Sequence, residues 1–551
     1  MSTTWILDVL RTNSTGSRRL TFACALLIAF AAAPLYAQSF QDLYDFNCTT
    51  GGCSPDDNGA LVQGSDGNLY GTTTKGGSNG DGTVFKVTTS GTYSDLVEFS
   101  STTGESPSAL TLASDGNFYG TTFAGGSSGD GTLFRFAPPN SLTVLHDFLG
   151  GADGKNPEVP PVEAKDGNLY GMTDSGATYR VTLPGGKFTA LPNKVPGLPT
   201  GGPFYLASDG NLYGTTFGGG TSGNGTVFRM TTAGAIKTIY NFTAIGSDGA
   251  GPLGPLTEGS DGNLYGTTGY GGGTADAGTV FKMTLSGIET VLHVFDPAPD
   301  GARPFAGLLI SSDGAFYGTT TQGGADGNGT LFEMAGGFFT KLVDFTGTSG
   351  TAPGQAAYTT LVQHTNGSFY GLTFYGGSAG VGNFYSFTPR NPLLTLIMEG
   401  PVWVKPGEPV EILGNNMNEV SSLTFGGVQA QFQAGSDTYL IATVPSAALD
   451  GLITATLVTG QQIESQEALR ILPVITNLDP SSGPVGTQVG IVGGGFAAAK
   501  KVTFGGVKAT SFTVASPTLI QAIVPAGAKT GKVAVITLNG TAASKQTFTV
   551  Q

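Results

Sequence analysis

The sequence predicts an all-β protein in which a seven-bladed β-propeller is followed by two immunoglobulin-like β-sandwich domains. Gly provides 89 of the 551 residues and only 12% are charged, a composition that favours short strands and tight turns. A nine-residue string recurs through the first part of the chain, and a different repeat replaces it afterwards. We therefore expect a propeller at residues 38–390 and sandwich domains at residues 391–472 and 473–551.

The recurring string is Ser-Asp-Gly-Asn-Leu-Tyr-Gly-Thr-Thr, which first occurs at Ser65–Thr73. It returns in four further close copies and two weaker ones, and the spacing between the tyrosines ranges from 43 to 53 residues. A unit of this size is too small to bury its own sheet face, so several units are expected to pack side by side. The seven tyrosines are Tyr70, Tyr119, Tyr170, Tyr213, Tyr265, Tyr317 and Tyr370.

Each unit divides into four short strands. In the first unit an apolar run at 60–62 leads to an Asp-Gly turn, which favours a tight hairpin with positive φ. A strand is then expected at 69–73 and, after a Gly-rich loop, another at 83–87, where alternating residues predict one buried face. A fourth strand at 95–99 completes the unit. Four-stranded units in repeated copies are typical of a β-propeller.

The two ends of the repeat region complement each other. The seventh unit stops after its third strand, at 384–387, and the missing fourth-strand pattern occurs at 42–46. The N-terminal segment is therefore expected to complete the last blade and to close the ring without exposed edges. A linear β-solenoid is the alternative, and it would not need complementary ends.

Residues 1–37 have the pattern of a secretory signal peptide. Three arginines form a basic region, residues 20–33 form an apolar run, and cleavage is expected after Ala37. An uncleaved anchor is the alternative. The mature protein is thus expected to be secreted, or to reside at the cell surface or in the periplasm.

Two cysteines remain in the mature chain, Cys48 and Cys53. In an exported protein such a close pair predicts a disulfide that closes a small loop, with two free thiols as the alternative. Two cysteines without a histidine cluster do not predict a zinc site.

The net charge of −14 arises from 25 basic and 39 acidic residues. Nucleic-acid binding needs a basic surface, and so does docking on anionic lipid, so both classes of partner are excluded. No membrane insertion is expected for the mature chain. An acidic excess is compatible with solubility or with loose binding of cations.

The repeated string, followed by Gly-Gly and by Gly-Thr-Val-Phe, resembles the GloVer tandem repeat of bacterial exported proteins. The resemblance covers residues 40–390. The family has no established biochemical activity, so the resemblance implies a repeat fold and export but no reaction.

The last domain resembles the IPT/TIG immunoglobulin-like family. The matching residues include the Pro-Ser-Ser-Gly-Pro segment at 480–484 and the Thr-Phe-Gly-Gly-Val segment at 503–507. The second segment recurs at 424–428, so residues 391–472 are identified as a divergent copy of the same unit. The resemblance implies a spacer or an interaction module.

The Gly-rich loops are the best candidates for a binding site. Propeller connectivity brings them, together with the links from fourth to first strands, to one face around the central channel. Aromatic rings beside short polar side chains can stack on sugars and bond their hydroxyl groups, and Asp and Asn oxygens can hold Ca²⁺ weakly. Plain turn chemistry is the structural alternative. The polar loop residues are Asp81, Asp130, Asn224, Asp276 and Asn328. The aromatic residues near the ends of the preceding strands are Phe123, Phe217, Tyr270, Phe374 and Tyr375.

Other repeated residues are expected to be structural. The aspartates of the Asp-Gly turns are assigned to local turn chemistry, and the repeated tyrosines to packing between blades. His146 and His293 occupy equivalent fourth-strand positions and are also assigned to structure, whereas His364 is expected to be exposed beside the seventh turn.

The sequence favours an exported, non-enzymatic binding protein. Its propeller would present the loop face to an extracellular glycan or protein, and the immunoglobulin-like tail would act as a spacer or docking module. A polysaccharide lyase or glycoside hydrolase acting in the channel is the alternative, and it would need acidic or basic side chains from several blades to converge. A structural component of the cell envelope is the third interpretation. No resident cofactor is expected.

Overall fold

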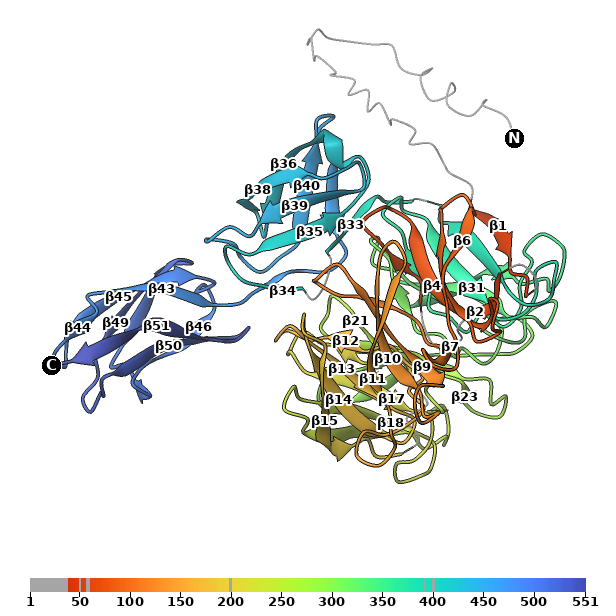
Figure 1. Ribbon diagram of the computed structural model, residues 1–551, viewed down its shortest axis with the longest axis horizontal. Helices are drawn as coiled ribbons and strands as arrows, with labels where there is room; N and C mark the ends of the chain where they lie inside the picture. Colours follow the sequence, from red (N-terminus) through yellow and green to blue (C-terminus); the bar gives the residue numbers. More distant parts are fainter. Residues whose placement is uncertain (1–37, 49–50, 56–59, 198–200, 391, 399–401) are drawn as a thin grey trace, which may run out of the picture.

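The computed structural model describes residues 38–48, 51–55, 60–197, 201–390, 392–398 and 402–551. The predicted signal peptide and its cleavage site at Ala37 lie outside these residues. Regular structure in the described ranges consists of β-strands and one short 3-10 helix, η1 at Met417–Glu419 (Figure 1). No helix in these ranges is long and apolar enough to cross a membrane.

The repeat region forms antiparallel sheets that all have the same strand order. In each sheet the first strand of the unit pairs with the second, the second with the third and the third with the fourth. The four strands follow chain order in six of these sheets, and in the seventh the N-terminal strand takes the fourth place. This pattern follows from the tight turns that join consecutive strands. Seven such sheets are found among the described strands between Ser39 and Thr388.

The first three sheets each follow this order. The first sheet contains β3 (Val62–Gln63), β4 (Leu69–Gly76), β5 (Thr83–Val87) and β6 (Tyr93–Glu98), and β2 (Gly52–Pro55) pairs with the end of β4. The second contains β8 (Thr111–Leu112), β9 (Phe118–Ala124), β10 (Thr132–Ala137) and β11 (Ser141–Asp147), with β7 (Glu105–Pro107) beside β9. The third contains β12 (Val162–Glu163), β13 (Asn168–Met172), β14 (Ala177–Thr182) and β15 (Lys187–Lys194).

The fourth to sixth sheets repeat the arrangement. The fourth contains β16 (Tyr205–Leu206), β17 (Leu212–Thr216), β18 (Thr226–Met230) and β19 (Ile236–Asn241). The fifth contains β21 (Thr257–Glu258), β22 (Leu264–Thr268), β24 (Thr279–Met283) and β25 (Glu289–Val294), and a separate pair joins β20 (Gly249–Ala250) to β23 (Tyr270–Gly271). The sixth contains β26 (Leu309–Ile310), β27 (Phe316–Thr319), β28 (Thr330–Ala335) and β29 (Phe338–Asp344).

The seventh sheet combines both ends of the repeat region. Its strands are β30 (Val362–Gln363), β31 (Phe369–Thr373), β32 (Asn383–Thr388) and, as the fourth strand, β1 (Ser39–Asp45). β1 pairs antiparallel with β32 from Ser39 opposite Thr388 to Asp45 opposite Asn383. The N-terminal segment therefore supplies the fourth strand of the seventh sheet.

The Asp-Gly turns use their aspartates as predicted, and they also fix the repeated tyrosines. In the first sheet, Asp66 accepts hydrogen bonds from the Asn68 backbone N–H (3.1 Å) and from the Tyr70 hydroxyl (3.0 Å). Gly67 between them has a φ of 74°, which a side chain would strain. In the seventh sheet the side chain of Asn366 replaces the aspartate and donates to the Tyr370 hydroxyl (2.9 Å).

Packing between neighbouring sheets forms the core of the repeat region. Tyr70 of the first sheet lies with its ring centroid 4.6 Å from that of Phe118 in the second, and both side chains are buried. Each buried cluster in this region combines residues of two consecutive sheets. One cluster joins Tyr370 and Phe384 of the seventh sheet to Phe85 of the first. The predicted packing role of the tyrosines is therefore confirmed.

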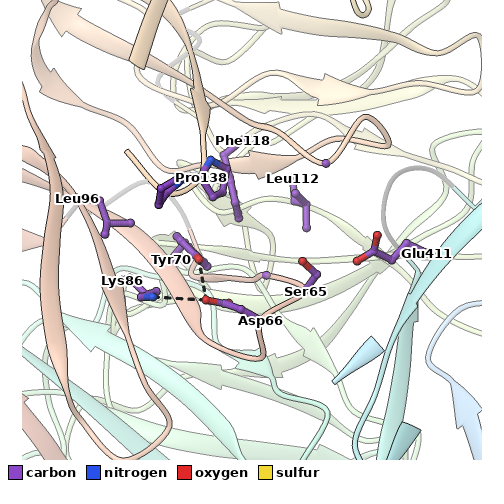
Figure 2. Close-up of a pocket in the computed structure, with 12 residues that line it drawn as sticks. Ser65, Asp66, Tyr70, Lys86, Leu96, Leu112, Phe118, Pro138 and Glu411 are labelled. Carbon is purple, nitrogen blue, oxygen red and sulfur yellow. Dashed lines mark hydrogen bonds and ion pairs between the residues drawn. The ribbon is translucent and has the colours of Figure 1, made fainter. Parts of the chain in front are cut away.

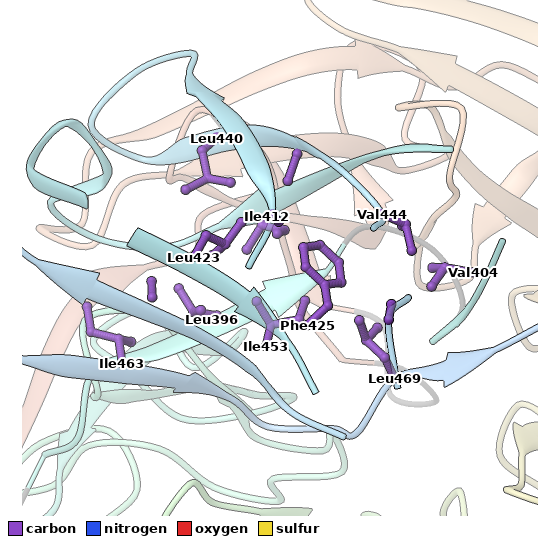
Figure 3. Packing of buried hydrophobic residues seen from close by; sticks show 14 of the residues in the cluster. Leu396, Val404, Ile412, Leu423, Phe425, Leu440, Val444, Ile453, Ile463 and Leu469 are labelled. Atoms are coloured by element: carbon purple, nitrogen blue, oxygen red, sulfur yellow. The ribbon is translucent and has the colours of Figure 1, made fainter. Parts of the chain in front are cut away.

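The region after the repeats begins with a second β-structure that has its own core. One sheet path contains β37 (Val428–Gln429), β36 (Val420–Phe425), β40 (Ile453–Leu457), β41 (Gln462–Ser465), β33 (Thr395–Met398), β35 (Pro409–Leu413), β39 (Tyr439–Thr443) and β38 (Gln431–Ala434). A short parallel pair joins β34 (Trp403–Val404) to β42 (Arg470–Ile471). Figure 3 shows Ile412, Leu423, Phe425 and Ile453 gathered between the strands of this middle domain.

The C-terminal region forms two facing sheets, as expected for an immunoglobulin-like domain. One contains β43 (Val474–Asp479), β45 (Gln488–Gly494), β49 (Leu519–Ile523) and β48 (Phe512–Ser516). The other contains β44 (Ser482–Gly483), β51 (Thr541–Val550), β50 (Gly531–Thr537), β46 (Ala499–Phe504) and β47 (Val507–Lys508). Phe504 pairs with Val507 across a tight turn, just as Phe425 pairs with Val428 in the middle domain.

Candidate functional site

The polar residues of the Gly-rich loops hold neighbouring sheets together through their backbones. The carbonyl of Asp81 accepts the N–H of Ser106 (3.0 Å), and the carbonyl of Asp130 accepts the N–H of Asn156 (2.8 Å). Asn224 and Asn328 make the same bond to the next repeat, at 2.8 and 3.2 Å. The side chains of these four residues are half-buried.

Asp276 differs from the other polar loop residues because its loop is one residue longer. Here Ala277 supplies the carbonyl that accepts the next repeat's N–H, from Arg303 (2.9 Å). Asp276 is exposed, and its carboxylate accepts the N–H of Gly271 (2.7 Å). Its side chain is therefore free to interact with Arg303 across the loop face.

Four of the residues whose N–H groups donate these hydrogen bonds have an unusual backbone conformation. Ser106, Asn156, Arg303 and Ala356 all have φ between 52° and 61°, the left-handed region that non-glycine residues avoid. Three of them precede a proline, which is the only sequence signal for the position. Strain of about 1–3 kcal/mol per residue persists only where surrounding bonds hold it, and here those bonds link one sheet to the next.

Four of the rings near the loops form one continuous set with two further aromatic residues from the links between repeats. Phe217 contacts Tyr270 (centroids 6.0 Å apart), and Tyr270 contacts Phe305 (5.7 Å). Phe305 stacks with Tyr358 at 5.9 Å, with an interplanar angle of 15°. Tyr358 contacts Phe374 (6.1 Å), which contacts Tyr375 (4.7 Å). We call these residues the aromatic row: Phe217, Tyr270, Phe305, Tyr358, Phe374 and Tyr375.

The aromatic row crosses four consecutive sheets. Phe217 and Phe374 directly follow the second strands of the fourth and seventh sheets, whereas Phe305 and Tyr358 lie in links that lead to first strands. Tyr375 is 48% exposed, and the other members are half-buried. The row thus has its position fixed by packing and still offers ring surface to solvent.

Arg303 makes a cation–π contact with the row. Its guanidinium carbon lies 4.0 Å from the ring centroid of Tyr270. The same guanidinium donates to the carbonyls of Gly269 (3.0 Å) and Asp276 (2.6 Å), and lies 3.5 Å from the Asp276 carboxylate. Because Arg303 and Asp276 pair with each other, this part of the row carries no net charge.

Sequence reasoning named four members of the row and missed two. Phe217, Tyr270, Phe374 and Tyr375 were expected on the loop face and are brought together. Phe305 and Tyr358 lie outside the repeated string, two residues after the positive-φ position, and the other units have no aromatic residue there in the described part of the chain. Phe123 is 39% exposed and has no ring contact with the row among the described residues.

The histidines make structural contacts. His146 and His293 each lie 3.1 Å from an aspartate, Asp153 and Asp300 respectively. The expectation that His364 is exposed is wrong, because its side chain is 3% exposed. Its Nδ1 accepts the N–H of Asn366 (3.0 Å), so Nε2 carries the proton and donates to the carbonyl of Gly67 (3.0 Å). The turn of the first sheet therefore covers His364.

Two further chemical features belong to the part of the chain that the structure describes. Cys48 and Cys53 form the expected disulfide. No group of three or more His, Cys, Asp or Glu side chains there is arranged to hold a metal ion.

Structural comparisons give distant likenesses. The extracellular domain of a putative hybrid two-component system from B. thetaiotaomicron is 11% identical, with a TM-score of 0.43, and the match covers 80% of this chain and 60% of that one. A fungal alcohol oxidase of the AA5 family in complex with copper is 13% identical, with a TM-score of 0.43 and coverage of 79% and 100%. A surface glycan-binding protein from Prevotella bryantii is 16% identical, with a TM-score of 0.20 and coverage of 27% and 38%.

Family comparisons cover both parts of the chain. None of the curated proteins matches the sequence. The Gloeobacter/Verrucomicrobia repeat matches residues 30–182 and 174–385, which together make up more than half of the chain. The IPT/TIG domain matches residues 473–550. The chain therefore belongs to the Gloeobacter/Verrucomicrobia repeat family and carries an IPT/TIG domain at its C-terminal end.

Proposed function

We propose that the protein is an exported, non-enzymatic binding protein whose aromatic row binds an uncharged glycan chain. The seven sheets close into a seven-bladed propeller at residues 38–390. Residues 391–472 are a divergent IPT/TIG-like domain, and together with residues 473–551 they hold the propeller away from the surface to which the tail is docked.

Ring closure is supported by the contacts between the first and last sheets. The cluster that joins Tyr370 and Phe384 to Phe85 uses repeat positions equivalent to those that meet between the first and second sheets, where Tyr70 and Val84 join Phe134. The pairing of β1 with β32 covers the edge that a linear array would leave open. In a linear solenoid the two ends of the repeat region lie apart, so they do not share a sheet.

The aromatic row is the observation that carries the proposed ligand. Rings with one side packed and another exposed offer apolar surface at little entropic cost, and sugars present matching C–H faces. The internal pairing of Arg303 with Asp276 removes the charge that would favour an acidic or basic ligand. Polar groups of the neighbouring loops remain available for hydroxyl groups.

Export is supported by the Cys48–Cys53 disulfide, since such bonds persist in oxidising compartments. N-terminal sequencing of the protein recovered from its native cells tests the cleavage after Ala37. A mature chain that still begins at Met1 would contradict this part of the proposal.

A binding screen with the purified full chain tests the proposed ligand. Pull-down on cellulose, xylan, mannan and chitin, each with calcium and with a chelator, should reveal retention on at least one matrix. The double variant Phe305→Ala, Tyr358→Ala should lose at least tenfold in affinity. Phe338→Ala, which removes a ring that is 78% exposed at the start of the sixth sheet's fourth strand, should bind normally. Retention on no matrix would overturn the glycan ligand, and release of reducing ends from the bound polysaccharide would overturn the non-enzymatic role.

A further inference from the structure

The middle domain contacts the turns at which the first and seventh sheets meet. The hydroxyl of Thr438 donates to the Ser65 carbonyl (2.6 Å), and the side-chain amide of Gln466 donates to Gln363 (3.1 Å). The backbone N–H of Thr395 lies 3.4 Å from the Thr365 carbonyl. These contacts come from three separate segments of the middle domain, so they define its position on the turns rather than a single point of attachment (Figure 1).

This junction encloses a pocket of about 240 Å³. The first sheet contributes Ser65, Asp66 and Lys86, the second contributes Leu112 and Phe118, and the middle domain contributes Glu411. Figure 2 shows Leu112 and Phe118 on one side of the space, and Ser65, Asp66 and Glu411 facing them. Neither part of the chain forms this pocket alone.

The polar wall of the pocket offers both hydrogen-bond donors and acceptors. The Lys86 ammonium lies 3.5 Å from Asp66, a distance that leaves donors of the ammonium for a ligand. Glu411 on β35 is half-buried, and its hydrogen bond with Ser65 holds the carboxylate at the opening. A carboxylate ligand would meet two carboxylates here, and an ammonium ligand would meet Lys86.

The opposite wall is aliphatic and aromatic. Leu112 and the edge of Phe118 lie beside Leu96 and the Pro138–Pro139 turn. A ligand that fits must therefore have one apolar side, and around it groups that both donate and accept hydrogen bonds. Hydroxyl groups do both, and a pyranose carries them around an apolar C–H face.

We propose that this pocket binds a single uncharged pyranose, as a second site separate from the aromatic row. The sugar hydroxyls donate to Glu411 and accept from Lys86, while its C–H face lies on Leu112 and the Pro138–Pro139 turn. Because the sugar bridges Glu411 of the middle domain and Lys86 of the first sheet, its binding also stabilises the docking of the middle domain on the repeat region.

Titration calorimetry and saturation-transfer NMR with D-glucose, D-galactose, D-mannose and D-xylose test this proposal on the full chain. At least one sugar should bind. Lys86→Gln and Glu411→Ala should each weaken its binding about tenfold, because each removes a charge-assisted hydrogen bond. Glu411→Gln keeps the shape and one set of hydrogen bonds, and should weaken binding less than Glu411→Ala does.

Lys282→Gln is the matched control, because Lys282 and Asp261 form the same pair in the fifth sheet, at 2.6 Å. Its sugar binding should equal that of the wild type. Binding of none of the four sugars would overturn the proposal, as would binding of n-butylamine in place of a sugar. Sugar binding that survives Lys86→Gln but disappears in the Phe305→Ala, Tyr358→Ala double variant would also overturn it, and would leave the function proposed for the aromatic row intact.

Discussion

The guanidinium of Arg303 lies over the ring of Tyr270, 4.0 Å from its centroid, although Arg303 itself has a φ of 61°. A strained backbone at one residue is thus combined with a cation–π contact to the next ring of the aromatic row. Contacts of this kind contribute about 0.5–2 kcal/mol, which is comparable to the cost of the left-handed conformation.

This relationship predicts different stabilities for two small substitutions. Arg303→Gly and Arg303→Ala both remove the guanidinium, but only glycine adopts φ near 61° without strain. We expect Arg303→Ala to be less stable than Arg303→Gly by about 1 kcal/mol in urea unfolding. Equal stability of the two variants would show that the backbone at this position relaxes in solution.

The packing of β1 in the seventh sheet predicts a second effect on stability. Phe40 of β1 stacks on Tyr385 of β32, with centroids 5.1 Å apart. Phe40→Ala should lower the free energy of unfolding by about 2 kcal/mol, less than for a fully buried ring because Phe40 is half-buried. Phe338→Ala, at a ring that is 78% exposed, is the control and should change stability by less than about 0.5 kcal/mol. A similarly small effect at Phe40 would contradict ring closure.

Glu289 on β25 gives a pH dependence with a defined sign. Burial raises its pKa from 4.5 to about 7, and the nearby Asp248 carboxylate adds to this effect. The folded state then binds more protons than the unfolded state between these values, so this group lowers stability as pH rises from 4.5 to 7. Glu289→Gln should be more stable than the wild type by roughly 1–2 kcal/mol at pH 8, after allowance for solvent screening, and should differ little at pH 4. Thermal unfolding at the two pH values measures the difference.

His364 gives the opposite pH dependence. Its burial lowers its pKa below 6.5, and Nδ1 accepts the N–H of Asn366, a bond that requires this nitrogen to be unprotonated. The folded state therefore binds fewer protons than the unfolded state, and this contribution to stability is lost as pH falls through 6.5. The stability advantage of the wild type over His364→Gln should shrink between pH 7.5 and pH 5. An advantage that stays constant would mean that His364 is accessible to solvent.

Much of the repeat architecture could be predicted because the same residue types make the same local turns and hydrogen bonds in each unit. The Asp66–Tyr70 pair and the Gly67 turn recur with fixed spacing, and the segment around Phe40 matches the strand that the seventh unit lacks. The aromatic row could be predicted only in part, because Phe305 and Tyr358 belong to links whose residues vary between units.

The errors have physical causes that the repeat pattern hides. His364 comes directly before a turn, a position that is usually exposed, but the Gly67 carbonyl of a different sheet covers it. The site at Glu411 combines segments more than three hundred residues apart, and no local pattern signals such a meeting. Contacts between units and domains depend on tertiary packing that a single sequence does not reveal.

The most direct test of the account is the affinity of the full chain for the polysaccharide that retains it, measured by calorimetry for Tyr358→Ala and Phe123→Ala. Both substitutions remove an aromatic ring associated with the loops, but only Tyr358 belongs to the aromatic row. We predict at least tenfold weaker binding for Tyr358→Ala and unchanged binding for Phe123→Ala. Equal loss in both variants, or loss in Phe123→Ala alone, would contradict the claim that the row is the binding site.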